Sequence, residues 1–372
     1  MIHPSVWRFV MTLPNLSLGL VIGLLVVSAP LAAQTRTLAT QPLFQPLLLA
    51  ADDYAEGWEH FIRFDDGSLL VSHFMISSMG PGNHRGIMVA TFTTPDGHTY
   101  VIKNGRKRKQ WEGVSGPNRI GIAKHYVEGS GHKYRIHLKN NTAEIDINFN
   151  AIGTPWQGNR VSLSEPDGEI YQDLMFYAPY LTATGRYRPG KDSGGGGNES
   201  WRLLTGGQGF ALRYVTSTGI YKLATDRLRL TTLGSESHRL TADLIKTTDG
   251  QWRPRMALWV NGRVRHQFGA VNIEPVWPND GQSHPKDIPQ SFTLSATAGD
   301  YQLTGTLHLN PLLHRFDVLA NMGILDRLFI GAFSAPVQSR YRANYQLRLS
   351  HNGGSQTLDG RALVEYVQIN PR

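Results

Sequence analysis

Residues 133–149, KYRIHLKNNTAEIDINF, decide the fold class. Apolar residues occupy every second position from Tyr134 to Leu138 and again from Ile145 to Phe149, with Asn140-Asn141 between the two runs. Successive side chains of a strand point to opposite faces, so the pattern predicts a β-hairpin with one buried and one wetted face. The same alternation recurs at 301–309 and 345–349, whereas sustained helical periodicity is scarce. We therefore expect an all-β protein.

The composition agrees with this expectation and excludes several classes of protein. The 372 residues include 39 Gly and 20 Pro, and 40% of them are hydrophobic, which argues against a disordered chain. The absence of Cys excludes disulfides, thiolate zinc sites, iron–sulfur clusters and a cysteine nucleophile. A chain of this length predicts about two domains.

Short motifs recur in the same order in the two halves of the chain. Thr93–Gly97 (TTPDG) resembles Thr247–Gly250 (TTDG), and Asn104–Arg106 (NGR) recurs as Asn261–Arg263. Each motif alone is an ordinary hairpin turn, but their shared order indicates a duplicated domain. We expect two similar β-domains, at residues 45–205 and 206–372, preceded by a linker at residues 34–44.

The N-terminal residues have the pattern of a secretory signal peptide. Residues 16–27 (LSLGLVIGLLVV) form a continuous apolar run that follows Arg8 and precedes mostly small residues at 28–33. The run is short for a membrane span. We expect residues 1–33 to be removed after Ala33, which would place the protein in a bacterial periplasm. An uncleaved N-terminal anchor is the alternative.

The stretch Pro311–Phe333 breaks the β pattern, because its apolar residues recur at helical spacing. One interpretation is a buried helix that plugs or flanks the second domain. The other is an interfacial helix that docks on a membrane and gates a lipid cavity, with Leu325, Leu328 and Phe329 as its docking residues.

A basic run at a hairpin turn supplies further membrane-docking candidates, Arg106, Lys107 and Arg108. Anionic lipid headgroups attract such residues by about 1 kcal/mol each, although a solvated turn is the alternative interpretation. The net charge is +8, yet an exported protein is not expected to bind nucleic acid. Peripheral contact with an anionic membrane surface is the expectation that this run supports.

No cofactor and no metal site are expected. Residues 185–192 (GRYRPGKD) nearly match a P-loop, but Asp192 stands where Ser or Thr should ligate magnesium. The sequence contains neither H-E-x-x-H nor G-x-S-x-G, and its His residues are scattered.

Closed β-barrels of about eight strands either fill with side chains or hold one apolar ligand. Large amphipathic residues would give a ligand cavity its apolar wall and its few polar groups, although most aromatic residues at strand spacing belong to a core. The ligand-binding candidates are Trp58, His60, His73, Met75, Trp111, Tyr126, Tyr177, Trp259 and Tyr366.

Several segments resemble one protein family. Gly57–Phe61 (GWEHF) precedes Leu69–Ser78 (LLVSHFMISS) and a glycine-rich break at 80–86, and Gly360–Val367 (GRALVEYV) is similar to a closing strand of the pattern G-x-x-x-x-E-Y. The chain thus resembles the survival-factor lipocalin-like family, which is related to AttH-like proteins and carotenoid hydratases (hydroxyneurosporene synthases). The resemblance implies two tandem lipocalin-like (calycin-type) antiparallel β-barrels packed side by side, with a hydrophobic small molecule or lipid as ligand. The doubled-tryptophan motif of the hydratase branch is a single Trp58 here, so its chemistry is not carried over.

Two functions stay open from the sequence, beside a structural or envelope-interaction role. In the first, the protein carries a hydrophobic molecule or lipid across the periplasm and needs no catalytic group. In the second, it is an isoprenoid- or carotenoid-type hydratase or cyclase with Glu365 as general acid, because burial would raise the pKa of that carboxyl. Strand alternation does not fix whether Glu365 faces the barrel interior, faces solvent or pairs with an arginine.

Overall fold

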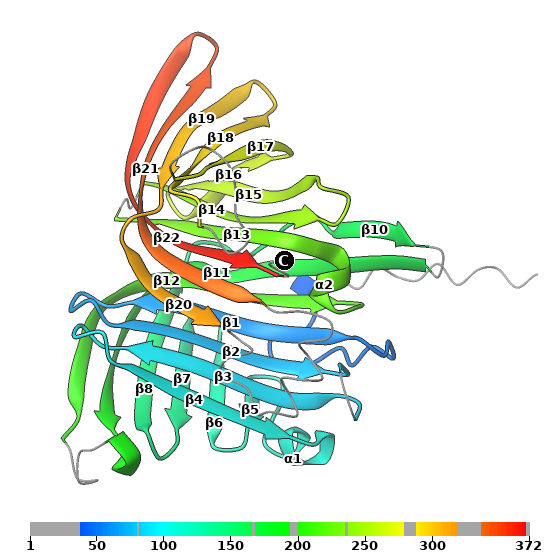
Figure 1. Cartoon of the computed structure of the whole chain (residues 1–372), viewed down its shortest axis with the longest axis vertical. Coiled ribbons are helices and arrows are strands. Elements are labelled where there is room, and N and C mark those ends of the chain that lie inside the picture. Colours follow the sequence, from blue (N-terminus) through cyan, green and yellow to red (C-terminus); the bar gives the residue numbers. More distant parts are fainter. Residues whose placement is uncertain are drawn as a thin grey trace, which may run out of the picture. The chain divides into compact units, whose positions relative to one another are not determined.

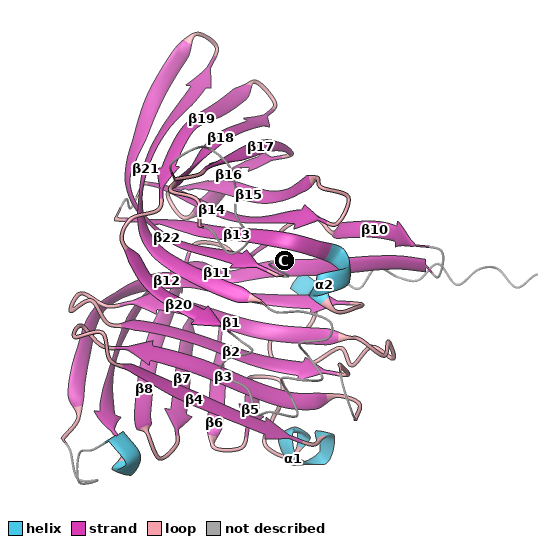
Figure 2. Ribbon diagram, in the orientation of Figure 1, coloured by secondary structure: helices cyan, strands magenta, loops and turns pink. Residues whose placement is uncertain are grey.

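The computed structural model describes residues 38–79, 82–165, 168–193, 200–234, 237–278, 288–317 and 336–369. Residues Thr37–Arg372 form one compact unit. Antiparallel strands dominate the described residues, which confirms the predicted all-β class (Figure 2). No helix among these residues is long and apolar enough to cross a membrane.

The first sheet contains twelve strands: β1 (Ala55–Arg63), β2 (Leu69–Ser77), β3 (Arg85–Thr93), β4 (Thr99–Arg106), β5 (Arg119–Ile122), β6 (His125–Ser130), β7 (Lys133–Lys139), β8 (Ala143–Ile152), β9 (Trp156–Gln157), β10 (Val161–Glu165), β11 (Gly168–Pro189) and β12 (Arg202–Thr216). Their order is β4-β3-β2-β1-β12-β11-β8-β7-β6-β5, and the short strands β9 and β10 pair with β11 (Figure 1). The last strand of this order, β5, also contacts β3 and β4, so the sheet nearly closes into a barrel.

The second sheet contains ten strands: β13 (Ala224–Leu233), β14 (His238–Thr247), β15 (Trp252–Val260), β16 (Arg263–Phe268), β17 (Ala270–Val276), β18 (Ser291–Ala298), β19 (Tyr301–His308), β20 (Leu312–Asp317), β21 (Val337–His351) and β22 (Gly354–Gln368). Their order is β16-β15-β14-β13-β22-β21-β19-β18-β17, and β20 pairs with β21. Contacts from β17 to β15 and from β18 to β16 nearly close this sheet as well. The two nearly closed barrels confirm the predicted fold.

The helical elements of the described residues are short. They are η1 (Leu38–Thr40), α1 (Arg108–Glu112), η2 (Lys191–Ser193) and α2 (Ile220–Leu223). A separate buried cluster joins the barrels and contains Phe176 and Phe210 of the first with Trp259 and Leu363 of the second. The barrels therefore share an apolar interface besides having a core each.

The first barrel extends past the predicted boundary at residue 205. Strand β12 crosses that boundary and pairs with β1 on one side and β11 on the other. Without β12, both of these strands would expose an unpaired edge. The second barrel consequently begins after Thr216, with β13 at Ala224.

The predicted linker also belongs to the first barrel. Leu38 and Phe44 are buried in its core, at 1% and 0% exposure. We call residues 38–51 the closing segment, because its leucines at 43, 47, 48 and 49 also pack against this core. The prediction of a linker was wrong here because it weighed position in the chain over the apolar residues, which gain free energy by leaving water.

The helix predicted over 311–333 is wrong for the part that the structure describes. Leu312–Asp317 forms strand β20, which pairs with β21. Pairing with an available strand satisfies the backbone groups of these residues, so tertiary context overrides their helical spacing. Residues 318–335 lie outside the described residues.

One of the repeated motifs forms the same turn in both barrels. The Thr94 hydroxyl donates to Asp96 Oδ1 at 2.5 Å, and the Thr247 hydroxyl donates to Asp249 Oδ1 at 2.5 Å. The glycine that follows each aspartate has a positive φ, 85° at Gly97 and 83° at residue 250.

Candidate functional site

Strand β1 contributes to two different environments, because successive side chains alternate between its faces. Glu56, Trp58 and His60 are buried on the side of the first barrel's core. Gly57 and Glu59 lie on the opposite face, where Glu59 accepts a hydrogen bond at 3.2 Å from an arginine of the second barrel. The two faces of this strand therefore define two candidate sites.

Inside the first barrel, His60 is a polar group in an aromatic wall. Its Nδ1 lies 2.9 Å from the Ser72 hydroxyl, and its Nε2 lies 2.5 Å from the Tyr177 hydroxyl. The rings of Phe74 and Phe149 pack edge-on against the imidazole at 6.3 and 5.7 Å between centroids. Burial lowers the pKa of His60 to about 3. The imidazole is therefore neutral near pH 7, with one ring nitrogen as donor and the other as acceptor.

The neighbouring polar groups of this barrel hold its closing segment. Arg213 bonds the carboxylate of Glu56 at 2.7 Å and donates to the carbonyl oxygens of Pro42 and Gln45 at 3.0 and 2.8 Å. Trp58 Nε1 donates to the carbonyl oxygen of Leu43 at 2.7 Å. Because main-chain groups of the segment use these side chains, we assign Arg213, Glu56 and Trp58 to closure of the barrel end.

Between the barrels, four arginines and three carboxylates form a mostly buried ionic network. Asp243 accepts hydrogen bonds from Arg255 at 2.7 Å and from Arg229 at 3.2 Å, and it also bonds Arg227. Burial opposes ionisation of Glu59, but Arg229 and the other nearby cationic groups outweigh it and lower the Glu59 pKa to about 2. The complete network consists of Arg227, Arg229, Arg255, Arg340, Glu59, Asp243 and Glu365.

Glu365 belongs to this network. It accepts hydrogen bonds from Arg340 at 2.9 Å and from Arg229 at 3.1 Å. Its neighbours Val364 and Tyr366 are in the core of the second barrel. The structure thus has the arrangement in which Glu365 pairs with arginines, and its role as general acid stays a prediction.

The interior of the second barrel contains an apolar cavity. The space that a water-sized solute could occupy in this cavity is only about 10 Å³, and its lining includes Leu230, Leu240, Phe292 and Leu294. Tyr345 supplies the single ionisable side chain of that lining. The side chains of this barrel therefore nearly fill its interior, and this lining offers no carboxylate or imidazole for proton transfer.

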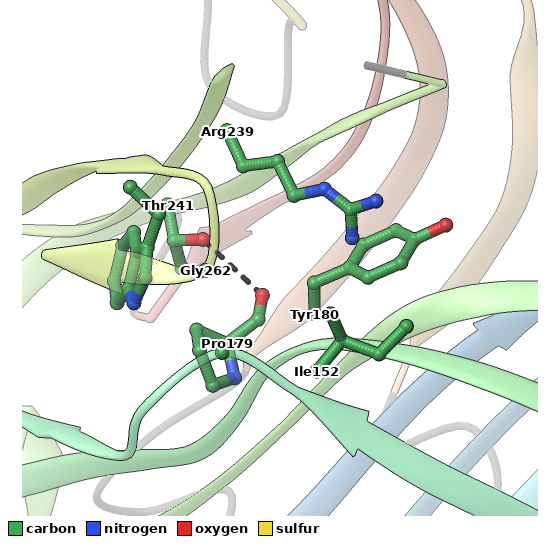
Figure 3. A pocket seen from close by; sticks show the side chains of 8 residues that line it. Ile152, Pro179, Tyr180, Arg239, Thr241 and Gly262 are labelled. Carbon is green, nitrogen blue, oxygen red and sulfur yellow. Dashed lines mark hydrogen bonds between the residues drawn. The ribbon is translucent and has the colours of Figure 1, made fainter. Parts of the chain in front are cut away.

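A second hollow lies at the junction of the barrels and has about 300 Å³ of empty space, open solvent included (Figure 3). The Arg239 guanidinium carbon lies 3.2 Å from the ring centroid of Tyr180. The Thr241 hydroxyl donates to the carbonyl oxygen of Pro179 at 3.2 Å (Figure 3). Both contacts join the two barrels, so we interpret this hollow as part of their joint.

Trp58, His60 and Tyr177 are the predicted ligand-binding residues that the structure brings together in the first barrel. His73 and Met75 lie on the outer face of β2, where the Tyr214 hydroxyl reaches both. The ligand-binding role of all these residues stays a prediction.

The remaining predicted ligand-binding residues are scattered. Trp111 donates to the carbonyl oxygen of His84 at 2.6 Å. The Tyr126 ring lies under an arginine guanidinium, 3.9 Å from its centroid. Trp259 packs in the interface between the barrels, and the Tyr366 hydroxyl donates to Asp226 in the second barrel at 2.7 Å. Any ligand-binding role for these four also stays a prediction.

The predicted docking residues fall into two groups. Leu325, Leu328 and Phe329 lie outside the described residues. Arg106 bonds main-chain and side-chain oxygens of its own turn. Lys107 precedes α1, and Arg108 pairs with Glu112 at 2.8 Å within it. Their contact with a membrane stays a prediction.

Apart from Glu365, the charged residues of the network between the barrels were not among the predicted site residues. Arg227 and Arg229 alternate with leucines along β13, which is the pattern of a strand with one wetted face. The wetted face is here the ionic interface with the first barrel. Among the described residues, no group of three or more His, Asp or Glu side chains is placed to hold a metal ion.

Several solved structures are similar in fold to this chain. No protein-family model and no curated protein matches its sequence. The crystal structure of CghA with Sch210972 is 11% identical with a TM-score of 0.59, and the match covers 90% of this chain and 96% of that one. An AttH-like protein from Nitrosomonas europaea is 13% identical with a TM-score of 0.55, over 88% and 95% of the two chains. Kievitone hydratase from Nectria haematococca is 11% identical with a TM-score of 0.50, over 84% and 88%.

These likenesses define a class of fold. The chain is a two-barrel lipocalin-like protein, and it shares this fold with CghA, the AttH-like protein and kievitone hydratase. The fold implied by the sequence resemblance is thereby confirmed.

Proposed function

We propose that the first barrel binds an apolar small molecule with a hydroxyl or carbonyl oxygen, and that Tyr177, oriented by His60, donates a hydrogen bond that polarises that oxygen. The observation that carries the proposal is the buried His60 imidazole, whose hydrogen-bond partners in the described structure are two neutral hydroxyls. A buried polar group costs free energy unless it is hydrogen-bonded. Ionisable groups perturbed in this way are concentrated at functional sites.

The protonation states limit the chemistry that this pair can perform. Burial lowers the pKa of His60 to about 3 and raises the pKa of Tyr177 well above its usual value. The imidazole is therefore a proton acceptor near pH 7, and the phenol is a hydrogen-bond donor. Direct protonation of an alkene needs a strong acid, so the pair is better suited to polarising a ligand oxygen through a hydrogen bond.

The structural neighbours favour an enzyme of this kind. One of them is named a hydratase, and another holds the small molecule Sch210972. Carriage of a hydrophobic molecule or lipid across the periplasm is the second candidate function, and the apolar lining of the second barrel favours it. Export and peripheral membrane contact belong to that second candidate and rest on the sequence.

A matched pair of ligands tests the proposed oxygen site. We would displace the fluorescent probe N-phenyl-1-naphthylamine from the purified protein with 1-dodecanol and with n-dodecane. One neutral hydrogen bond contributes about 1 kcal/mol, so dodecanol should bind about fivefold more tightly than dodecane. Tyr177→Phe should abolish this preference. Tyr134→Phe is the control, because the Tyr134 hydroxyl bonds the carbonyl oxygen of Gly131 instead.

Equal displacement by the two ligands, or a preference that survives Tyr177→Phe, would contradict the oxygen site. Turnover then separates the two candidate functions. The protein is incubated in D₂O with a panel of unsaturated apolar alcohols, which are analysed by mass spectrometry. Deuterium incorporation that Tyr177→Phe abolishes indicates an enzyme, whereas tight retention of an unlabelled alcohol indicates carriage.

A further inference from the structure

The outer face of β1 holds a second constellation, on the side away from His60. His73 Nε2 lies 2.9 Å from the Tyr214 hydroxyl. In the sheet register, Gly57 pairs with Tyr214 on one side, and Glu59 pairs with His73 on the other. The imidazole and the phenol thus meet across the backbone at Gly57.

Glycine at position 57 makes this meeting possible. A Cβ atom at Gly57 would lie 2.5 Å from His73 Nε2 and 2.6 Å from a ring carbon of Tyr214. Both distances are too short for non-bonded atoms, so any larger residue would push the two rings apart. The hydrogen bond between His73 and Tyr214 therefore depends on the absence of a side chain at Gly57.

Among the residues that the structure describes, the pair faces an ionic network with one positive charge in excess. Four arginines are present against three carboxylates, and burial lowers the pKa of His73 and raises that of Tyr214, so both are neutral near pH 7. Asp173 does not supply the missing charge, because Arg160 already bonds it at 2.7 Å.

One arginine of this positively charged network also has an unsatisfied hydrogen-bond donor. The Nη2 nitrogen of Arg227 is buried and has no hydrogen-bond partner in the part of the chain that the structure describes. Arg227 and Arg229 both bond Asp243, and Arg229 also bonds Glu59. Glu59 Oε1 lies 3.7 Å from His73 Nε2, so Arg227 belongs to the ionic cluster that adjoins this pair. Buried polar groups are nearly always satisfied, so such a donor indicates a missing acceptor.

Solvent reaches this end of the network. The side chains of His73 and Glu59 are 30% and 19% exposed, whereas those of Arg227 and Arg229 are 7% and 4% exposed. A small solute that arrives at His73 would therefore approach the arginines from the open end.

We infer that this part of the barrel interface is an anion site that binds the carboxylate of a small organic acid. Arg227 Nη2 donates to the carboxylate, the Tyr214 hydroxyl donates a second hydrogen bond, and His73 lines the entrance. One carboxylate supplies the single negative charge that the network lacks, and its planar oxygens fit guanidinium donors. The site lies on the opposite face of β1 from the proposed oxygen site and does not depend on it.

Benzoate is the probe that tests this site, with uncharged benzyl alcohol as its control. The protein is labelled with ¹⁵N-histidine, and His73→Gln identifies the His73 signals. Benzoate should shift these signals in a saturable manner, and benzyl alcohol should not. Tyr214→Phe should weaken benzoate binding about fivefold, as expected for one lost hydrogen bond, while Tyr366→Phe in the second barrel should leave it unchanged.

Gly57→Ala should weaken benzoate binding at least as much as Tyr214→Phe does, because the added methyl group separates His73 from Tyr214 without changing any charge. Should this variant fail to fold, Tyr214→Phe decides alone, since it keeps the ring and its packing. His73 signals that do not respond to benzoate would overturn the proposal. Binding that is equal in the native protein and in Tyr214→Phe would overturn it too, because benzoate would then lie elsewhere.

Discussion

The two barrels share an architecture but differ in what their interiors contain. The first barrel buries Glu56, His60, His125 and Arg213, and all of them take part in hydrogen bonds. In the described interior of the second barrel, aliphatic and aromatic residues surround the cavity, and Thr232 and Tyr345 are its polar groups. The buried Arg229 of this barrel bonds Glu59 of the first barrel instead, and Arg227 bonds Asp243 in the same ionic network.

This difference shows where ligand chemistry can reside. Polar groups in a core are costly unless each is hydrogen-bonded, so a barrel that needs only stability does better with apolar residues. The second barrel follows that rule, and we regard it as the stable partner. The first barrel departs from it at His60, where the proposed function places the ligand oxygen.

The largest effect should come from breaking the buried ion pair of the first barrel. Arg213→Met leaves the Glu56 carboxylate without its cation and two carbonyl oxygens without their donor. Both side chains of the pair are 0% exposed, so we expect a loss of about 4 kcal/mol in the free energy of unfolding. Urea denaturation measures this loss, and the double variant Glu56→Gln/Arg213→Met should recover part of it. A loss below about 1 kcal/mol would mean that water replaces the pair.

The matching change in the second barrel should be somewhat smaller. Leu258 is 1% exposed in the apolar core, so Leu258→Ala should cost about 3 kcal/mol through lost transfer free energy and a cavity. The fivefold preference of the native protein for dodecanol over dodecane should not change. A changed preference would show that the second barrel takes part in binding the oxygen.

Mild acid should weaken the first barrel before the second. The pKa of His60 is about 3 in the folded protein, mainly through burial, and about 6.5 in an unfolded chain. Below pH 6.5 the unfolded state takes up a proton that the folded state does not, so stability falls as pH falls. Between pH 6.5 and 5 the loss from His60 alone should be about 2 kcal/mol.

Urea denaturation at the two pH values measures this loss. His60→Asn is expected to reduce the dependence by about that amount, and the exposed His98→Asn is the control. Hydrogen exchange at pH 5 should show lower protection in β1 and β2 than in β13 and β14. Equal loss of protection in both barrels would contradict the asymmetry.

The fold could be predicted from the sequence because its signals are local. The alternation from Tyr134 to Phe149 forms the hairpin of β7 and β8, as expected. The helix expected at 311–333 fails at Leu312–Asp317 because pairing with β21 is a long-range contact that local spacing does not encode. The boundary at residue 205 fails for the same reason, since only the register of β12 with β1 shows where the first barrel ends.

The candidate sites were less predictable than the fold. Trp58, His60 and Tyr177 stand out by residue type, and the structure brings them into one barrel. The role of Gly57 depends on two rings that are 16 and 157 positions away in the chain. Arg227 resembles any solvent-facing residue of an alternating strand, because the sequence does not show that the first barrel covers that face of β13.

The smallest effect tests whether the two barrels share more than their topology. Thr94→Ala and Thr247→Ala each remove the hydroxyl that bonds the aspartate of the repeated turn, at 2.5 Å in both barrels. Both threonines are buried, and each change should cost about 1 kcal/mol in the free energy of unfolding. Urea denaturation of the two variants measures the costs side by side. Equal costs would mean that the two turns contribute equally to stability, so the barrels differ in their interiors alone. A cost confined to Thr94→Ala would mean that the turns, too, have diverged.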